Sequence, residues 1–259
     1  LLEITMTDGV DRLTKTRVAP PLRKDFRNFN EFEETLKERM KHFIHYMVDG
    51  CNVVDKIHAR LMPTPLLSCV IDDCIEKGLD VSNGGARYNF TSPQAVGIAN
   101  LADSLFVLKE FVFDEQNVSF EELNNILDSN FEGNERLRQK VLNLYPKFGN
   151  DIDEVDLIAA KWAEEYCRLV FDNVNPRGGS YQPGLYSVSS HVPLGLVVGA
   201  TPDGRLAKEP LADGGISPMR GRDRNGPTAV LKSVSKLPLI LATNGTLLNL
   251  KFHPSIFRT

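Results

Sequence analysis

A long amphipathic stripe near the start of the chain restricts the fold more than any other sequence feature. Apolar side chains recur there at helical spacing, at Phe32, Leu36, Met40, Phe43, Ile44, Met47, Cys51, Val54, Ile57 and Leu61. Asn30 is a good N-cap, and Glu33 three residues later completes a capping-box pattern. Pro63 ends the stripe, because proline does not continue a helix. We predict one long helix over 30–61, in which Gly50 is the residue most open to a bend.

Shorter helical patterns follow along the rest of the chain. They cover residues 1–9, 66–77, 94–112, 134–144, 153–171 and 227–236, and Ser119 with Glu122 starts one more. The last third changes character. Residues 185–192 and 246–252 have the pattern of strands, and residues 207–226 hold several Gly and Pro and are predicted to form a long ordered loop. Many helices with a few well-spaced strands predict an α/β fold.

Composition argues against several classes of protein. The net charge is −4, from 30 basic and 34 acidic residues, which is unlike a nucleic-acid-binding or membrane-surface protein. No apolar run reaches the length of a membrane-spanning helix. Four cysteines in 259 residues do not make a disulfide scaffold, so we expect a cytoplasmic protein. The chain starts at Leu1 rather than Met and ends soon after an apolar stretch, and we therefore expect a piece of a longer polypeptide.

Most side chains that could bind a ligand or take part in catalysis also have structural explanations. Glu38, His42 and His45 share one helix face, but a solvated charged face explains them better than a metal site, so no metal is predicted. Arg87 and Arg177 lie in glycine-rich turns and could hold an anionic substrate or, more commonly, a neighbouring carboxylate. The four cysteines are expected to be buried, inert thiols: Cys51, Cys69, Cys74 and Cys167.

The strand predicted over 185–192 is the more informative candidate. Its alternation would place Tyr186, Val188 and Ser190 on one face, together with Val192. Such a face, with a few polar groups among apolar ones, could line a small-molecule pocket, or it could belong to a half-exposed strand. The pattern leaves both interpretations open.

A series of motifs along the whole chain resembles the glycyl radical enzymes. One is Gly84-Gly85-Ala86-Arg87-Tyr88-Asn89-Phe90-Thr91, which is similar to the GGA(R/K)YNF segment of the dehydratase-type branch of that family. Others follow in family order: Asn175-Pro176-Arg177-Gly178-Gly179, Thr201-Pro202-Asp203-Gly204-Arg205, Glu209-Pro210-Leu211-Ala212-Asp213-Gly214 and Asn244-Gly245-Thr246-Leu247-Leu248-Asn249. No single motif is decisive, but together they are specific.

The resemblance implies a fold and a position within it. The family fold is a ten-stranded α/β barrel made of two antiparallel five-stranded half-barrels and surrounded by helices. Residues 1–259 would form a single partial domain, the middle-to-late portion of that barrel. The sequence contains neither the Gly-Cys-Val-Glu-type motif of the thiyl cysteine nor the Arg-Val-x-Gly-Tyr-type motif of the radical glycine. The resemblance therefore implies that this chain holds no catalytic residue and itself binds no cofactor.

The resemblance also implies partners for the complete enzyme. Its glycyl radical would be installed by an activating enzyme that uses S-adenosylmethionine and an iron–sulfur cluster. The complete enzyme would act on a small molecule in the cytoplasm. It would be a homo-oligomer, either a dimer or a tetramer, with no nucleic-acid or membrane partner.

The implied reaction is radical dehydration of a small polyol such as glycerol or propane-1,2-diol. Tyr186 and Ser190 would donate hydrogen bonds to substrate oxygens, and Val188 would shape the pocket. Asn89 and Asn249 are weaker candidates for the pocket wall, since hydrogen bonding within loops explains each of them. Two other functions stay open: a formate acetyltransferase that cleaves a C–C bond with coenzyme A, and an inert fragment or scaffold.

Overall fold

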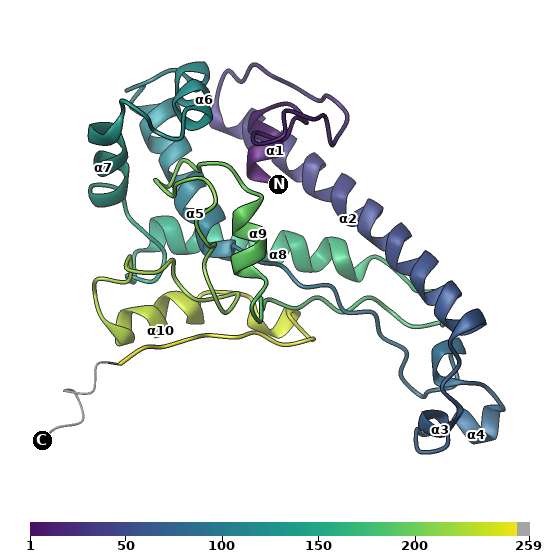
Figure 1. Cartoon of the computed structure of the whole chain (residues 1–259). Coiled ribbons are helices and arrows are strands. Elements are labelled where there is room, and N and C mark those ends of the chain that lie inside the picture. Colours follow the sequence, from purple (N-terminus) through teal and green to yellow (C-terminus); the bar gives the residue numbers. More distant parts are fainter. Residues whose placement is uncertain (253–259) are drawn as a thin grey trace, which may run out of the picture.

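A computed structural model describes residues 1–252 and is almost entirely helix and loop (Figure 1). The α-helices are α1 (Leu2–Met6), α2 (Phe29–Leu61), α3 (Pro65–Ser68), α4 (Cys74–Lys77), α5 (Ile98–Val107), α6 (Phe120–Asp128), α7 (Glu135–Asn143), α8 (Asp153–Phe171), α9 (His191–Leu196) and α10 (Pro227–Ser235). Short 3-10 turns lie at η1 (Val81–Asn83) and η3 (Leu239–Leu241), and a π-helical turn, η2 (Leu108–Asp114), continues α5. No helix in this part of the chain combines the length and the apolar character needed to cross a membrane.

Helix α2 confirms the predicted long helix, which runs without interruption through Gly50. Its N-cap is Asn28 rather than Asn30. The Asn28 side-chain oxygen accepts a hydrogen bond from the Glu31 backbone N–H at 3.0 Å, and the Arg27 backbone N–H donates to the Glu31 carboxylate at 3.0 Å. The capping box therefore lies two residues earlier than predicted, because Asn28 and Glu31 satisfy the same spacing rule.

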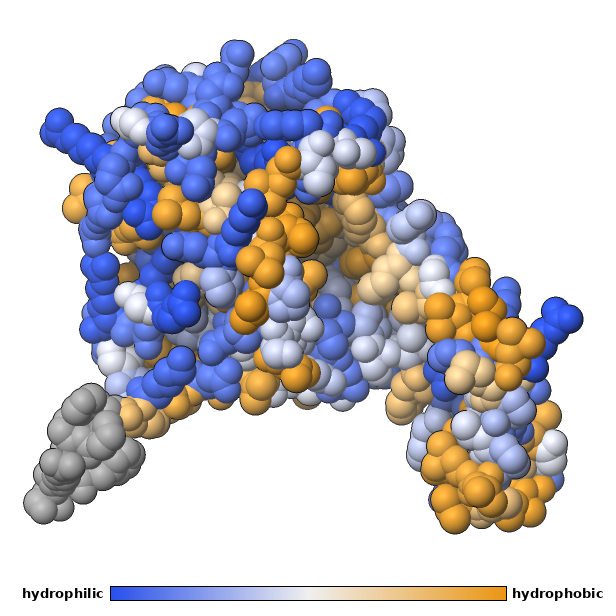
Figure 2. All heavy atoms as spheres, viewed as in Figure 1, coloured by the Kyte–Doolittle hydropathy of each residue, from blue (hydrophilic) through white to orange (hydrophobic). Residues whose placement is uncertain are grey.

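Only the first half of α2 is buried. Its buried side chains end at Val48, and the second half projects from the body of the molecule and carries α3 and α4 at its tip (Figure 1). Apolar side chains gather on the surface of this projecting end (Figure 2), where Leu61, Leu66 and Val70 are exposed. The apolar stripe of the sequence thus correctly predicts the helix, but half of the stripe is not covered within the described residues.

The core is built around α5 and α8. Helix α5 packs along α8, and α2 and α10 also contact α8 (Figure 1). Helix α8 has the bounds that the sequence predicts and buries one face that includes Val155, Ala159, Trp162 and Val170. Burial of a side chain such as Val155 or Val170 contributes roughly 1.5–3 kcal/mol, so the packing of α5 against α8 stabilises the body.

The predicted strands are not present in the described residues, which contain only isolated β-bridges. Residue 185 pairs in parallel with residue 246, but the chain turns at Val188, whose φ is +51°, and enters α9 at His191. A strand requires extended backbone with negative φ, so the alternation over 185–192 ends after a few residues. The strand predicted over 246–252 is wrong for a different reason: a single bridge and isolated hydrogen bonds join this segment to its neighbours, so no continuous ladder forms.

Three extended segments nevertheless lie side by side. Residues 180–187 lie between residues 91–95 and residues 244–249, with parallel bridges at Thr91–Tyr181, Gln94–Gly184 and Leu185–Thr246. Backbone hydrogen bonds on both sides of the middle segment support these bridges. The ten-stranded barrel is not formed by residues 1–252; what they contain is this short parallel arrangement with helices around it.

Two predicted helices are shorter than expected. Residues 66–77 separate into α3 and α4, because Asp73 adopts a left-handed conformation just before α4. The pattern over 94–112 becomes helical only at Ile98, after Gly97 with φ +89°, because Gln94 is engaged in a bridge. The Ser119 cap is confirmed, with its hydroxyl accepting from the Glu122 backbone N–H at 3.0 Å. Residues 207–226 contain no helix or strand, as predicted.

Candidate functional site

The three predicted wall residues do not share one face. Tyr186 is partly buried, whereas Val188 is 71% exposed and Ser190 is exposed at the start of α9. Ser187, expected on the opposite face, is buried and lies 3.2 Å from the Nδ1 atom of His191. The positive φ of Val188 cancels the two-residue period from which the shared face was inferred. Of the three residues, only Tyr186 lies within the parallel arrangement.

The Tyr186 hydroxyl has one partner among the described residues. The Asn244 side-chain amide donates to it over 3.4 Å, which is a long and weak hydrogen bond. Asn244 is itself held by its backbone N–H, which donates to the Pro183 carbonyl at 2.9 Å. Because the hydroxyl accepts from Asn244, its own hydrogen remains free to be donated elsewhere.

A loop over residues 212–217, which we call the glycine loop, bridges the middle and last extended segments. The Ser187 N–H donates to the Gly214 carbonyl at 3.2 Å. On the other side the Asn249 N–H donates to the Ser217 hydroxyl at 2.9 Å. Asn249, a weaker wall candidate, therefore acts through its backbone here, and its side chain is exposed. The glycine loop connects the Tyr186 segment to the 247–249 segment.

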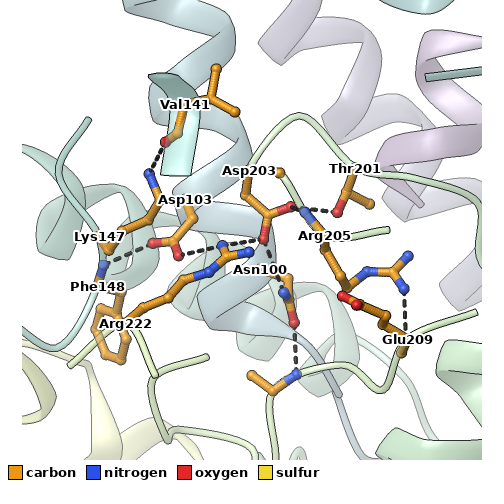
Figure 3. A network of polar contacts seen from close by, with 12 residues as sticks. Asn100, Asp103, Val141, Lys147, Phe148, Thr201, Asp203, Arg205, Glu209 and Arg222 are labelled. Carbon is orange, nitrogen blue, oxygen red and sulfur yellow. Dashed lines mark hydrogen bonds and ion pairs between the residues drawn. The ribbon is translucent and has the colours of Figure 1, made fainter. Parts of the chain in front are cut away.

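A buried polar network fixes this loop to α5 (Figure 3). The Asn100 side chain accepts from the Ala212 N–H at 2.7 Å and donates to the Asp203 carboxylate at 3.1 Å. Arg205 is also fully buried and donates to the carbonyls of Leu206 and Glu209 at 2.9 and 2.7 Å. Each contact joins a loop of the last third to another loop position or to α5, so the network holds the loops in place.

Arg222 lies at the centre of the network between two carboxylates. Its guanidinium is 2.6 Å from Asp203 and 3.2 Å from Asp103 (Figure 3), and the side chains of both acids are 1% exposed or less. Asp103 also accepts from the Phe148 N–H at 2.7 Å. Forming such a buried ion pair costs desolvation energy, but removing one partner destabilises the fold strongly because a charge is left buried without compensation. The pair therefore fixes the positions of Arg222, Asp103 and Asp203 relative to one another.

The pKa values of the two carboxylates are shifted in opposite directions. Burial raises the pKa of Asp103 to about 6, because it outweighs the opposing charges of Arg222 and Lys147. Burial acts on Asp203 in the same direction, but the close Arg222 charge and the hydrogen bonds from Thr201 and Asn100 lower its pKa to about 2. Asp203 is thus the permanently ionised partner of Arg222.

The other candidates have structural roles. The Asn89 side chain donates to the Ala86 carbonyl at 2.9 Å, which fits hydrogen bonding within its loop. Arg87 pairs with Asp73 at 2.7 Å and Arg177 with Asp55 at 3.0 Å, so both arginines hold neighbouring carboxylates.

The cysteines and possible metal ligands show no reactive cluster. Cys74 and Cys167 are buried as expected, whereas Cys69 is exposed and Cys51 is intermediate. Burial raises the pKa of Cys167 to about 11, which keeps this thiol protonated. In residues 1–252 no three His, Cys, Asp or Glu side chains are grouped to hold a metal ion.

Comparison with known families decides where the chain belongs. The pyruvate formate lyase-like family model matches residues 1–195. The chain belongs to the pyruvate formate lyase-like family. A second model, that of the glycine radical, matches residues 212–259, and the resemblance to glycyl radical enzymes is thereby confirmed. The interpretation of residues 1–259 as a single partial domain stays a prediction.

Several members of the family are similar over almost the whole chain. It is 42% identical over 260 residues to trans-4-hydroxy-L-proline dehydratase of Clostridioides difficile, a match that covers 99% of this chain and 32% of that protein. It is 35% identical over 259 residues to (2S)-3-sulfopropanediol dehydratase of Klebsiella oxytoca, with coverage of 97% and 31%. The chain thus spans about a third of the length of these relatives.

Solved structures agree with the sequence relatives. The glycerol-bound B12-independent glycerol dehydratase from Clostridium butyricum has a TM-score of 0.95 and 45% identity, and the match covers 100% of this chain and 33% of that one. A propanediol-dehydrating enzyme from Roseburia inulinivorans gives a TM-score of 0.95 at 44% identity, again over 100% of this chain and 33% of that one. The chain therefore shares the local fold of glycyl radical dehydratases.

The sequence missed the polar network. Asp203 and Arg205 lie in the TPDGR motif, which carries only the family resemblance, and no local pattern marks Asp203 as the partner of Asn100 in the predicted helix over 94–112. The TPDGR motif places Asp203 and Arg205 beside turn-forming proline and glycine, where charged side chains are usually exposed, so local sequence does not signal that they are buried.

Proposed function

We propose that this chain is the middle-to-late barrel portion of a glycyl radical dehydratase that removes water from a small hydroxylated substrate such as glycerol or propane-1,2-diol. The observation that carries the proposal is the 42% identity to a dehydratase over 99% of the chain. Matches at 35% and 38% to two further proteins named as dehydratases support the same reaction class. No comparable observation favours a formate acetyltransferase or an inert scaffold.

The chain would contribute part of the wall of the reaction chamber. The parallel segments at residues 91–95, 180–187 and 244–249 would become barrel strands when the rest of the polypeptide pairs with them. Tyr186 would face the substrate and donate its free hydroxyl hydrogen to a substrate oxygen. Val188 and Ser190 would complete the wall, provided that the exposed turn carrying them is covered by the remaining polypeptide.

The radical-bearing residues would lie outside this chain, because residues 1–259 contain no Arg-Val-x-Gly-Tyr-type motif although the glycine radical model matches residues 212–259. A glycyl radical, installed by an activating enzyme that uses S-adenosylmethionine and an iron–sulfur cluster, would generate a thiyl radical on a cysteine, and that thiyl would abstract the hydrogen atom from the substrate carbon. The residues of this chain would bind the substrate, orient its hydroxyl groups and exclude water from the chamber. The complete enzyme would work in the cytoplasm as a dimer or tetramer.

The test uses the complete protein, activated without oxygen by its activating enzyme. We expect a glycyl radical signal in electron paramagnetic resonance and formation of an aldehyde from glycerol or propane-1,2-diol. A radical without turnover of glycerol, propane-1,2-diol, hydroxyproline or sulfopropanediol would contradict the dehydratase proposal. Formation of acetyl-coenzyme A from pyruvate would instead identify the acetyltransferase.

The role of Tyr186 is tested in the same enzyme. Tyr186→Phe removes only the hydroxyl, which in a substrate contact should lower kcat/KM about 10-fold or more. The radical content should be unchanged. If Tyr186→Phe leaves both kcat and KM at the wild-type values, Tyr186 does not contact the substrate.

A further inference from the structure

The glycine loop lies unusually close to the backbone of the Tyr186 segment. Gly214 and Gly215 have φ of +68° and +116°, which residues with a side chain rarely adopt. A Cβ atom on Gly215 would lie 2.1 Å from the Leu185 carbonyl oxygen and 2.5 Å from the Tyr186 Cα. Atoms do not approach so closely, so only glycine allows the two backbones this contact.

The glycine loop is held at both ends. At its start, the Ala212 N–H donates to Asn100 at 2.7 Å, and Asn100 is tied to the buried Asp203. At its end, the Ser217 hydroxyl is 2% exposed and accepts from the Asn249 N–H at 2.9 Å. The loop is therefore anchored on α5 on one side and on the last extended segment on the other.

The Tyr186 segment is held less firmly on its downstream side. Leu185 is buried and bridged, but two residues after Tyr186 the chain reaches the exposed Val188. The contact between the segment and the glycine loop is the Ser187 N–H to Gly214 carbonyl hydrogen bond at 3.2 Å. Leu185 is held by backbone hydrogen bonds to Gly245 and Leu247 at 2.9 and 3.3 Å, so the part of the segment expected to shift is the Tyr186 end beyond these bonds.

We propose that Gly215 is a positioning residue that sets the place of Tyr186 and thereby the discrimination between small polyol substrates that differ in one hydroxyl, such as glycerol and propane-1,2-diol. This inference rests on the proposed function, since it assigns Tyr186 to the substrate. Because Gly215 has no side chain, the backbone at Leu185 and Tyr186 can lie close to the glycine loop, and in this position the Tyr186 hydroxyl would reach the substrate. A residue with a side chain at this position moves the wall.

The expected movement follows from the distances. To restore the shortest tolerated separation of 3.0 Å, the Leu185 oxygen at 2.1 Å must move by about 0.9 Å. A displacement of about 1 Å at a binding group can cost about 100-fold in rate. Substrates that differ in one hydroxyl should suffer unequally, because a displaced hydrogen-bond donor matters only to the substrate that uses it.

The experiment compares Gly215→Ala with Gly221→Ala in the complete, activated enzyme. Gly221 has φ +76° but nothing within 4 Å of its Cβ position, so its substitution brings backbone strain without the contact. We expect Gly215→Ala to change the ratio of kcat/KM for glycerol to that for propane-1,2-diol by about 10-fold at unchanged radical content. Gly221→Ala should keep the ratio within about 2-fold of wild type.

Crystal structures of both variants give a readout that does not need turnover. Gly215→Ala should displace the Tyr186 backbone by at least about 0.5 Å, the shortfall of its 2.5 Å separation from 3.0 Å, whereas Gly221→Ala should not. If Gly215→Ala does not fold, Ser217→Ala replaces it: loss of the bond to Asn249 should also change the substrate ratio, by a smaller factor than about 10-fold but by more than Gly221→Ala does.

The outcomes separate this inference from the proposed function. Absence of dehydration by the activated wild-type enzyme refutes the proposed function, and the crystal structures still test the position of Tyr186. If the wild type is active, the inference alone is overturned by a Gly215→Ala structure in which Tyr186 has not moved. It is overturned as well by a substrate ratio that does not change in Gly215→Ala or, where that variant does not fold, in Ser217→Ala. A ratio that shifts equally in Gly221→Ala also overturns it, because strain and not contact would then be the cause.

Discussion

Replacement of Arg222 by methionine should destabilise the protein strongly at neutral and alkaline pH. Methionine keeps much of the aliphatic volume but removes the guanidinium that lies 2.6 Å from Asp203 and 3.2 Å from Asp103. Loss of one partner from a buried ion pair typically costs 3–5 kcal/mol, because an uncompensated charge stays buried. We expect a loss of about 4 kcal/mol at pH 8, a large part of the 5–15 kcal/mol by which domains are stable.

The loss should depend on pH with a defined sign. Asp103, whose pKa is raised to about 6, is ionised at pH 8 and mostly protonated at pH 5. At pH 5 the substitution therefore removes the partner of Asp203 only, and the difference in free energy of unfolding between wild type and variant should be smaller. Without Arg222, the buried carboxyls of Asp103 and Asp203 bind protons more tightly in the folded protein than in the unfolded chain. The free energy of unfolding of the variant therefore falls as pH rises.

Urea unfolding at both pH values measures this difference. Trp162 is the single tryptophan of residues 1–259 and is buried in the α5–α8 core, so its fluorescence contributes to the unfolding signal of the complete protein. Arg168→Met is the matched control: Arg168 forms an exposed i,i+4 pair with Glu164, and its removal should leave the urea midpoint unchanged. Equal midpoints for Arg222→Met and Arg168→Met, or a larger loss at pH 5 than at pH 8, would refute the reasoning.

Two further predictions concern buried groups. The raised pKa of Asp103 means that its contribution to stability is fully present below the ordinary carboxyl pKa of about 4 and is lost as pH rises through about 6. The urea midpoint of Asp103→Asn should therefore rise relative to that of wild type as the pH increases from 4 to 7. A difference in midpoint that does not change with pH would contradict the assignment. The Tyr166 hydroxyl is buried without a hydrogen-bond partner among the described residues, so Tyr166→Phe should be neutral or stabilise by about 1 kcal/mol. A loss above about 1 kcal/mol in the melting of the complete protein would show that the hydroxyl has a partner there.

Local signals account for the parts of the fold that the sequence predicts well. The bounds of α8 and the cap at Ser119 follow from spacing and hydrogen bonding within a few residues, and both agree with the structure. The same rule predicted Asn30 as the cap of α2 and was wrong by two residues, because Asn28 with Glu31 has the same spacing and local sequence does not rank the two pairs. The sequence also predicts the family correctly, because the short motifs and their order along the chain can be recognised without knowing which residues they contact.

Contacts between distant residues decided the rest. The strand over 185–192 fails because Val188 adopts a positive φ that its alternating pattern does not reveal. Asn100 and Ala212 are 112 positions apart, and Arg222 and Asp103 are 119 apart, so no spacing rule connects them.

By itself the sequence determined the long helices α2 and α8 and the family, since these depend on neighbours along the chain. Only the tertiary structure decided which charges are buried together and how near Gly215 lies to Tyr186. The physical reason is that ion pairing and steric contact depend on distance in space, and that distance is set only once α5, α8 and the loops have packed.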